Sequence, residues 1–375
     1  MGAVIESPAW QVIRRTPFSA EGEETGFFVR TGTFFLFSIF SIGFIVIMIE
    51  MIEKKRHGFS ILITLMMGAL VYWSWKSPIR VASANQACPQ FAAGVVVGNI
   101  ESTFLTETSG IAASRKNTNV LWAHNDSGDS ARVFAMNLQG RHLGIYNLVG
   151  ASAVDWEDIA IGPGQTTAQD YLYVGDTGDN ARRRTSVTVY RIPEPAVSAD
   201  QTPVSLDLTD WEILPMQYPG SVVYDAETLL ADPISGDLFL VTRDRAGEGV
   251  ARVFRNPAPH TAGVTVTLEL VATLSLPMEV KGGDISPFGN AILLRPHSFS
   301  TPANGYHWTR APATNVWDAF SQQPCLTPLA NEPQGEALAF TADGNGYLTT
   351  SEGSNPPIYY YARQFFPIYL PLILR

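Results

Sequence analysis

The stretch Asp155-Trp156-Glu157-Asp158-Ile159-Ala160 holds the pattern that decides the fold, a glutamate followed at once by a short apolar run. Similar copies return later in the chain, at Asp225-Ala226-Glu227-Thr228-Leu229-Leu230 and at Gln334-Gly335-Glu336-Ala337-Leu338-Ala339. Two weaker copies complete the series, Ser109-Gly110-Ile111-Ala112 and Gly283-Asp284-Ile285-Ser286. From Ser109 through Glu157, Glu227 and Gly283 to Glu336 the steps are 48, 70, 56 and 53 residues. A repeat of this length indicates that each copy belongs to one supersecondary unit, which must pack on its neighbours.

The units read as sheets of short strands. From Gly94 onward the chain consists of short apolar runs separated by Gly, Asn, Asp and Pro, without an amphipathic helix of ordinary length. Strands with turn signals about every 8 to 12 residues are typical of a sandwich, barrel or propeller. The long repeat selects the propeller, whose blades are four-stranded sheets around a channel. The sequence therefore predicts an all-β fold, a β-propeller over residues 94–363.

Closure of the ring follows from the last unit, which runs out of chain after three strands. Residues 94–104 supply the missing outer strand, and an N-terminal strand in the C-terminal blade would remove the open edge. We expect five blades, since six would need a blade hidden in the step of 70 residues. The expected outer strands of the second, third and fourth blades are residues 205–214, 264–276 and 316–326.

The N-terminal part of the chain is apolar. Residues 33–51 are long enough to span a bilayer as a helix. A short basic loop around Lys54-Lys55-Arg56 separates them from a second apolar run, residues 59–75. The sequence thus predicts an N-terminal tail (1–30), a transmembrane helical segment of two helices (31–76) and a linker (77–93). A cytoplasmic basic loop places the propeller on the extracytoplasmic side of the cell membrane.

A second interpretation of this region shares that endpoint. Met51 would be the start of translation, residues 59–75 the apolar part of a signal peptide, and the protein would be secreted after cleavage behind Ala84. At the other end of the chain, residues 364–375 form an apolar tail that is too short to span a membrane.

Charge and cysteine usage restrict the partners and the compartment. The net charge of −10 argues against a nucleic-acid partner and permits cations. The two cysteines, Cys88 and Cys325, would form one disulfide in an oxidising compartment. The alternative of two unpaired buried thiols stays open, because sequence does not give the distance between them.

Acidic residues are expected to gather at one mouth of the channel, because the first strand of a blade begins where the second ends. The predicted metal ligands are Glu157, Glu227, Glu336, Asp126, Asp176 and Asp284. Carboxylates this dense raise one another's pKa unless a cation joins them, and oxygen donors favour Ca²⁺. The alternative is that such acids accept backbone hydrogen bonds from the next blade and lock the ring.

Basic residues at the same mouth are the candidate catalytic groups. His124 and His297 could act as a base, and Arg243 and Arg295 as an anion clamp. No nucleophile motif accompanies them, so a hydrolase would have to rely on metal-bound water or a metal-polarised substrate.

The repeated motifs resemble the SdiA-regulated family of exported bacterial β-propellers. The likeness rests on Ser-Gly-Ile-Ala, Asp-x-Glu-Asp-Ile-Ala, Glu-Thr-Leu-Leu, Asp-Ile-Ser and Pro-Gln-Gly-Glu-Ala-Leu-Ala, and covers about residues 94–363. More distantly the chain resembles metal-binding propellers of the gluconolactonase and phytase-like groups. That resemblance implies a central divalent metal, and in some members hydrolysis of lactones or phosphoesters. The chain departs from the pattern at Lys281-Gly282-Gly283, where a glutamate is missing.

Three functions remain open at this point. The first is a membrane-anchored extracytoplasmic module that binds a small molecule or a protein, with a divalent cation at one mouth. The second is a metal-dependent hydrolase of small esters, lactones or phosphoesters, so the sequence leaves open whether the protein is an enzyme. The third is a structural surface protein without a site. The missing nucleophile and incomplete glutamate ring favour the first.

Overall fold

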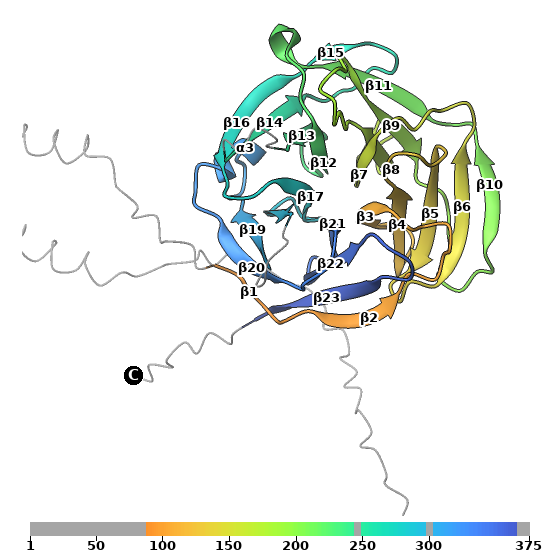
Figure 1. The fold of residues 1–375 in the computed structure, drawn as a ribbon. Helices are drawn as coiled ribbons and strands as arrows, with labels where there is room; N and C mark the ends of the chain where they lie inside the picture. The colour runs from red at the N-terminus through yellow and green to blue at the C-terminus, as the bar shows by residue number, and fades with distance from the viewer. Residues whose placement is uncertain (1–87, 244–248, 298–302, 366–375) are drawn as a thin grey trace, which may run out of the picture. The chain divides into compact units, whose positions relative to one another are not determined.

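Five β-sheets are arranged around a central axis in the computed structural model, which describes residues 88–243, 249–297 and 303–365 (Figure 1). We refer to the space along this axis as the channel. The first blade consists, from the channel outward, of β3 (Thr108–Ala113), β4 (Val120–Asn125), β5 (Arg132–Asn137) and β6 (His142–Leu148). The second consists of β7 (Trp156–Pro163), β8 (Asp170–Asp176), β9 (Val187–Pro193) and β11 (Glu212–Gln217). The third consists of β12 (Ala226–Ala231), β13 (Leu238–Thr242), β14 (Val250–Asn256) and β16 (Glu269–Ser275). The fourth consists of β17 (Val280–Ile285), β18 (Ala291–Pro296), β19 (Ala303–Thr309) and β20 (Cys325–Leu329).

The fifth blade joins the two ends of the described chain. Its inner strands are β21 (Gly335–Phe340), β22 (Gly346–Ser351) and β23 (Pro357–Gln364), and its outer strands are β2 (Val95–Asn99) and β1 (Gln90–Phe91). Strand β2 pairs antiparallel with β23, with Val95 opposite Tyr360. The prediction of five blades closed by an N-terminal strand is therefore confirmed.

Two short strands cross from one blade to the edge of another. Strand β10 (Val204–Leu208) adds to the first blade, parallel to β6, and β15 (Val266–Thr267) adds to the second, parallel to β11. The predicted outer strand at 205–214 was thus wrong in part, because it joins the segment of β10 to the start of β11. In the same way, 264–276 merges β15 with β16.

The fourth blade corrects another boundary. Val316–Ala319 form one turn of helix, α3, rather than the start of an outer strand. Asn315 caps this turn reciprocally with Asp318, a capping box that satisfies two backbone N–H groups at the start of a helix. The outer strand begins later, at Cys325.

The transmembrane part of the fold prediction is corrected. Among the described residues, no helix is both long and apolar enough to cross a membrane. The two helices expected at 31–76, the alternative signal peptide and the tail 1–30 lie outside the described residues, as do residues 366–375. The fold that the structure supports is the propeller, and the membrane segment is not retained.

The core lies between the blades, in five layers of buried side chains. Trp122 and Trp156, for example, are fully buried where the first and second blades meet, and Tyr173 and Phe254 where the second and third meet. Burial of one such large side chain stabilises the fold by about 1.5–3 kcal/mol. Because both faces of each sheet are covered, a strand such as β13 is buried along its whole length.

The two cysteines form a disulfide, which settles the alternative left open by the sequence. Cys88 precedes β1, Cys325 begins β20, and their Cα atoms lie 5.5 Å apart. The bond therefore fastens the N-terminal end of the closing blade to the outer strand of its neighbour.

Candidate functional site at the channel mouth

Every inner strand carries a β-bulge at the same place, near its first residue. The strand pairing skips one residue in each of the first four blades, and two in the fifth. A bulge bends the strand and re-aims a side chain. The bulged positions are Ser109, Glu157, Glu227, Lys281 and Glu336, which we call the mouth ring.

Neighbouring members of the mouth ring contact one another. Lys281 Nζ lies 2.9 Å from Glu227 Oε2 and 2.7 Å from Glu336 Oε1. Ser109 Oγ lies 3.3 Å from Glu336 Oε2 and donates to the backbone oxygen of Glu157 at 2.6 Å. The side chains of Glu157 and Glu227 share a hydrogen bond. The bulges thus bring residues from five distant sequence positions into one closed ring.

Lys281 neutralises two of the three glutamates. Its side chain is 8% exposed, and those of Glu227 and Glu336 are 1% and 6% exposed. Arg243 forms a second ion pair with Glu227 and a third with Glu279, where its Nε lies 2.7 Å from Oε2. Burial raises the pKa of Glu227, but Lys281, the hydrogen bond from Glu157 and Arg243 outweigh it and hold that pKa below its usual range.

Glu157 has no such compensation. It is 2% exposed, and no basic side chain among the described residues forms an ion pair with it. Burial raises its pKa well above the usual range, and the nearby charges of Glu227 and Asp126 raise it further. Without a cation, these effects favour the protonated form of Glu157, whose hydroxyl donates the hydrogen bond that Glu227 accepts.

Two overlapping groups of carboxylates meet at Glu157. One group is Glu157 with Asp126 and Asp155, and the other is Glu157 with Asp225 and Glu227. Within each group, one oxygen from every residue lies within 4.8 Å of the others. Oxygens bound to one Ca²⁺ at about 2.3–2.6 Å are separated by no more than about this distance. The donor set is thus compatible with a hard divalent cation.

Gly178 explains how these carboxylates come so close to the backbone. A Cβ at this position would lie 2.0 Å from Glu157 Oε1 and 2.6 Å from Asp155 Oδ2. Gly178 also donates its backbone N–H to the backbone oxygen of Asp155 at 3.1 Å. Any larger residue would displace both acids, so the glycine of the Asp-Thr-Gly-Asp motif provides room rather than an unusual backbone angle.

Some of the acids at the mouth also accept hydrogen bonds from backbone N–H groups, which is the alternative role that the sequence left open for them. Asp225 Oδ1 accepts from the N–H of Asp179 at 2.8 Å, which connects the third blade to the second. Asp176 accepts from the N–H groups of Val154 and Asp155 and pairs with Arg184 Nη1 at 2.7 Å. Asp176 therefore fixes the backbone just before β7.

Asp284 is the predicted ligand that lies farthest from the group. It comes near the end of β17, so it lies toward the opposite end of the channel from the mouth ring. Asp284 Oδ2 accepts from the N–H of Phe340 at 2.8 Å and locks the fourth blade to the fifth. Burial raises the pKa of Asp284 to about 6. The equivalent of the glutamates in this blade is Lys281.

The structure thus brings together four of the six predicted ligands, Asp126, Glu157, Glu227 and Glu336. Lys281, Asp155, Asp225 and Gly178 are the important residues that the predicted site did not include. The departure at Lys281 was visible in the sequence, but the bulge that aligns it with Glu157 was not.

Two of the four candidate catalytic groups are engaged inside the fold. His124 is fully buried, and its Nδ1 contacts the backbone oxygen of Asn125 at 2.8 Å. Burial lowers the pKa of His124 to about 4, so this ring is neutral at physiological pH. Arg295 is 3% exposed, pairs with Glu332 at 2.9 Å and donates to the backbone oxygen of Ala337 at 2.9 Å. Arg295 therefore joins the fourth blade to the fifth, and the His124 ring packs against Trp156 of the second blade.

Arg243 and His297 do lie at the mouth. Arg243 is half-buried and bound to Glu227 and Glu279. Burial lowers the pKa of His297, with a further contribution from the charge of Lys281. The backbone N–H of His297 donates to the backbone oxygen of Glu279 at 2.7 Å.

Comparisons with known proteins give no family for this chain. No protein-family model matches it, and no curated protein matches it in sequence. Among solved structures, it is similar to the crystal structure of the RRP9 WD40 repeats, with a TM-score of 0.38 and 9% identity over 73% of this chain and 100% of that one. The structure of U3-55K gives a TM-score of 0.35 and 8% identity over 73% and 99%. Similarity at this level does not indicate a ligand, and the resemblance to the SdiA-regulated family stays a prediction.

Proposed function

We propose that the propeller is a binding module for a small molecule or a protein, and that its channel mouth holds a divalent cation. The observation that carries this proposal is the surroundings of Glu157, a buried carboxylate without a basic partner among the described residues. Asp126 and Asp155 offer their oxygens within the same 4.8 Å. A cation bound by these three acids would supply the compensation that Lys281 gives Glu227 and Glu336.

The three acids suit Ca²⁺ better than a transition metal. All the donors are carboxylate oxygens, and no histidine or cysteine belongs to either described acidic group. Ca²⁺ takes about six to eight oxygens, so three carboxylates leave positions for water or a ligand. The disulfide supports an extracytoplasmic location. Extracellular modules bind Ca²⁺ with dissociation constants of about 10⁻⁴ to 10⁻³ M.

The bound cation would make the mouth a recognition surface. Asp126 and Asp155 are partly exposed, whereas Glu157 is buried beneath them. The open coordination positions would therefore face solvent and accept an oxygen of a ligand, for example a carboxylate or a backbone carbonyl. Without the cation the same surface is acidic and would repel such a group.

Thermal unfolding of the full chain in EDTA and in millimolar Ca²⁺ tests the proposal. At about 10 mM Ca²⁺, which is about 10 to 100 times such a Kd, binding adds about 1.4 to 2.7 kcal/mol to the free energy of unfolding and raises the Tm by several degrees. Glu157→Gln should abolish this rise but leave the Tm in EDTA nearly unchanged, because Gln resembles the protonated acid. Glu269→Gln, an exposed acid on the outer strand β16, is the matched control and should keep the full rise. An equal rise in all three proteins would contradict the proposal.

The hydrolase alternative receives less support from the geometry. His124 and Arg295 are buried and engaged, which leaves His297 and Arg243 as the mouth residues for a base and an anion clamp. Ca²⁺-dependent turnover of a generic lactone or phosphoester that disappears with Glu157→Gln would raise this alternative above the binding module.

A further inference from the structure

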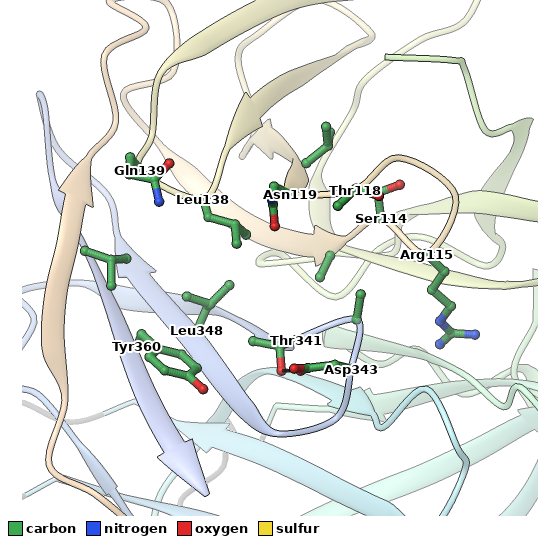
Figure 2. A pocket seen from close by; sticks show the side chains of 14 residues that line it. Ser114, Arg115, Thr118, Asn119, Leu138, Gln139, Thr341, Asp343, Leu348 and Tyr360 are labelled. Atoms are coloured by element: carbon green, nitrogen blue, oxygen red, sulfur yellow. Dashed lines mark hydrogen bonds between the residues drawn. The ribbon is translucent and has the colours of Figure 1, made fainter. Parts of the chain in front are cut away.

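A cleft opens between the first and fifth blades, toward the end of the channel opposite the mouth. Its volume is about 390 Å³, in the range of sites that hold a small molecule. The walls come from the loop between β3 and β4, the turn between β5 and β6, the loop after β21, and strands β2 and β23 (Figure 2). Segments from opposite ends of the described chain therefore build one cavity.

One end of the cleft is apolar. Val97, Leu138 and Tyr360 are partly buried and pack against the buried layer between the two blades, to which Leu348 belongs. The labelled side chains of Leu138, Leu348 and Tyr360 lie together in Figure 2, away from the charged group. They leave apolar surface open to the cavity, and a ligand that covers it would gain about 25 cal/mol per Å².

The other end holds Arg115. This residue is partly buried and lines the cleft. It has no hydrogen bond or ion pair with the described part of the chain, although its charge acts on the fully buried Asp284. By contrast, most other partly or fully buried arginines here, such as Arg243, Arg255 and Arg295, bind carboxylates. A planar guanidinium offers two parallel N–H donors that match a carboxylate.

Asp343 is the one acidic residue among the described residues that line the cleft, and it limits the charge of an occupant. Asp343 lies near Thr341 in Figure 2, and its carboxylate oxygens accept hydrogen bonds from residues of its own turn. It accepts from Thr341 Oγ1 at 2.6 Å and from the backbone and side-chain nitrogens of Asn345 at 3.0 and 2.9 Å. These hydrogen bonds outweigh burial and lower the pKa of Asp343, so it stays ionised. Arg115 is the one cationic residue among the described residues that line the cleft, so a second negative charge on a ligand would meet Asp343 without a second cation to offset it.

We propose that this cleft binds a small monocarboxylate with an apolar body, whose carboxylate pairs with Arg115 and whose body lies against Val97, Leu138 and Tyr360. The site is separate from the acidic mouth and does not depend on a cation. It would give the propeller a second ligand, held between the blade that closes the ring and the first blade.

Calorimetric titration of the full chain with octanoate tests the site, with 1-octanol and octyl phosphate as comparison probes. Octanoate should bind at one site per chain. Octanol has no charge to pair with Arg115, and octyl phosphate carries a second negative charge that meets Asp343. Both probes should therefore bind more weakly than octanoate. Arg115→Gln should weaken octanoate about tenfold or more, as loss of a charge-assisted hydrogen bond implies, and Leu138→Gln should also weaken it.

The control is Arg183→Gln, which removes the same charge from an exposed loop on another blade and should leave the affinity unchanged. Circular dichroism and the Tm of each variant show whether it folds as the parent does. Octanoate affinity that is the same in Arg115→Gln and the parent would overturn the proposal, as would absence of binding to the parent at millimolar concentration.

Discussion

Removal of the Lys281 side chain by Lys281→Met tests the electrostatics of the mouth ring. The ammonium group makes two ion pairs, with Glu227 at 2.9 Å and Glu336 at 2.7 Å, and all three side chains are at most 8% exposed. Breaking a buried ion pair by removing one partner costs about 3–5 kcal/mol, because the other charge stays buried. In a domain of this size that loss should lower the Tm on the order of 10 °C.

The pH dependence separates a charge effect from a packing effect. Burial raises the pKa of Glu227, and Lys281 is the largest of the influences that lower it. In the folded variant, the buried carboxyl group that has lost Lys281 keeps its proton above about pH 4.5, whereas the same group in the unfolded chain is ionised there. The variant should therefore lose free energy of unfolding as the pH rises, and its deficit should be larger at pH 8 than at pH 5.

Urea denaturation at both pH values measures the deficit. The double variant Lys281→Met with Glu336→Gln removes one of the stranded charges and should recover part of the loss. A deficit below about 1 kcal/mol, the size typical of exposed pairs, or one that does not change with pH, would refute the electrostatic role of Lys281 in the mouth ring.

Three further predictions concern the site and the closing blade. Gly178→Ala places a Cβ 2.0 Å from Glu157 Oε1, so it should cost about 1–3 kcal/mol in urea denaturation and eliminate the rise in Tm with Ca²⁺. Burial raises the pKa of Asp126 to about 6. Titration calorimetry should therefore show that the Ca²⁺ affinity increases between about pH 5 and 7, by about tenfold per pH unit for each proton displaced. In EDTA, the ionisation of Asp126 should lower the free energy of unfolding as the pH rises from about 4 to 6. Cys88→Ser removes the bond to Cys325 and should cost about 2–4 kcal/mol, a difference that disappears when the parent is measured in a reductant.

The sequence was sufficient for the architecture because a propeller repeats. Similar apolar runs at steps of 48 to 70 residues predicted five blades. The short last unit predicted closure by residues 94–104, where β2 is found. The edge strands β10 and β15 could not be predicted in the same way. Each pairs in parallel with a strand of another blade, and sequence periodicity reports strand character but not the partner.

The site was predictable where a motif and its register coincide. Glu157 and Glu227 follow the pattern and lie at the mouth, as expected. In the fourth blade the apolar run after Asp284 gave the wrong alignment, because the bulge at Lys281 comes two residues before Gly283 and leaves no trace in hydrophobicity. Arg295 was misassigned for a related reason, since its partner Glu332 is 37 residues away.

A crystal structure of the propeller grown with Ca²⁺, with the ion identified by its anomalous scattering, would decide whether the mouth is a cation site. We predict one ion bound by Asp126, Asp155 and Glu157, with Lys281 still between Glu227 and Glu336. A mouth without an ion at a Ca²⁺ concentration well above the expected millimolar Kd, with Glu157 still bound to Glu227, would contradict the proposed cation site.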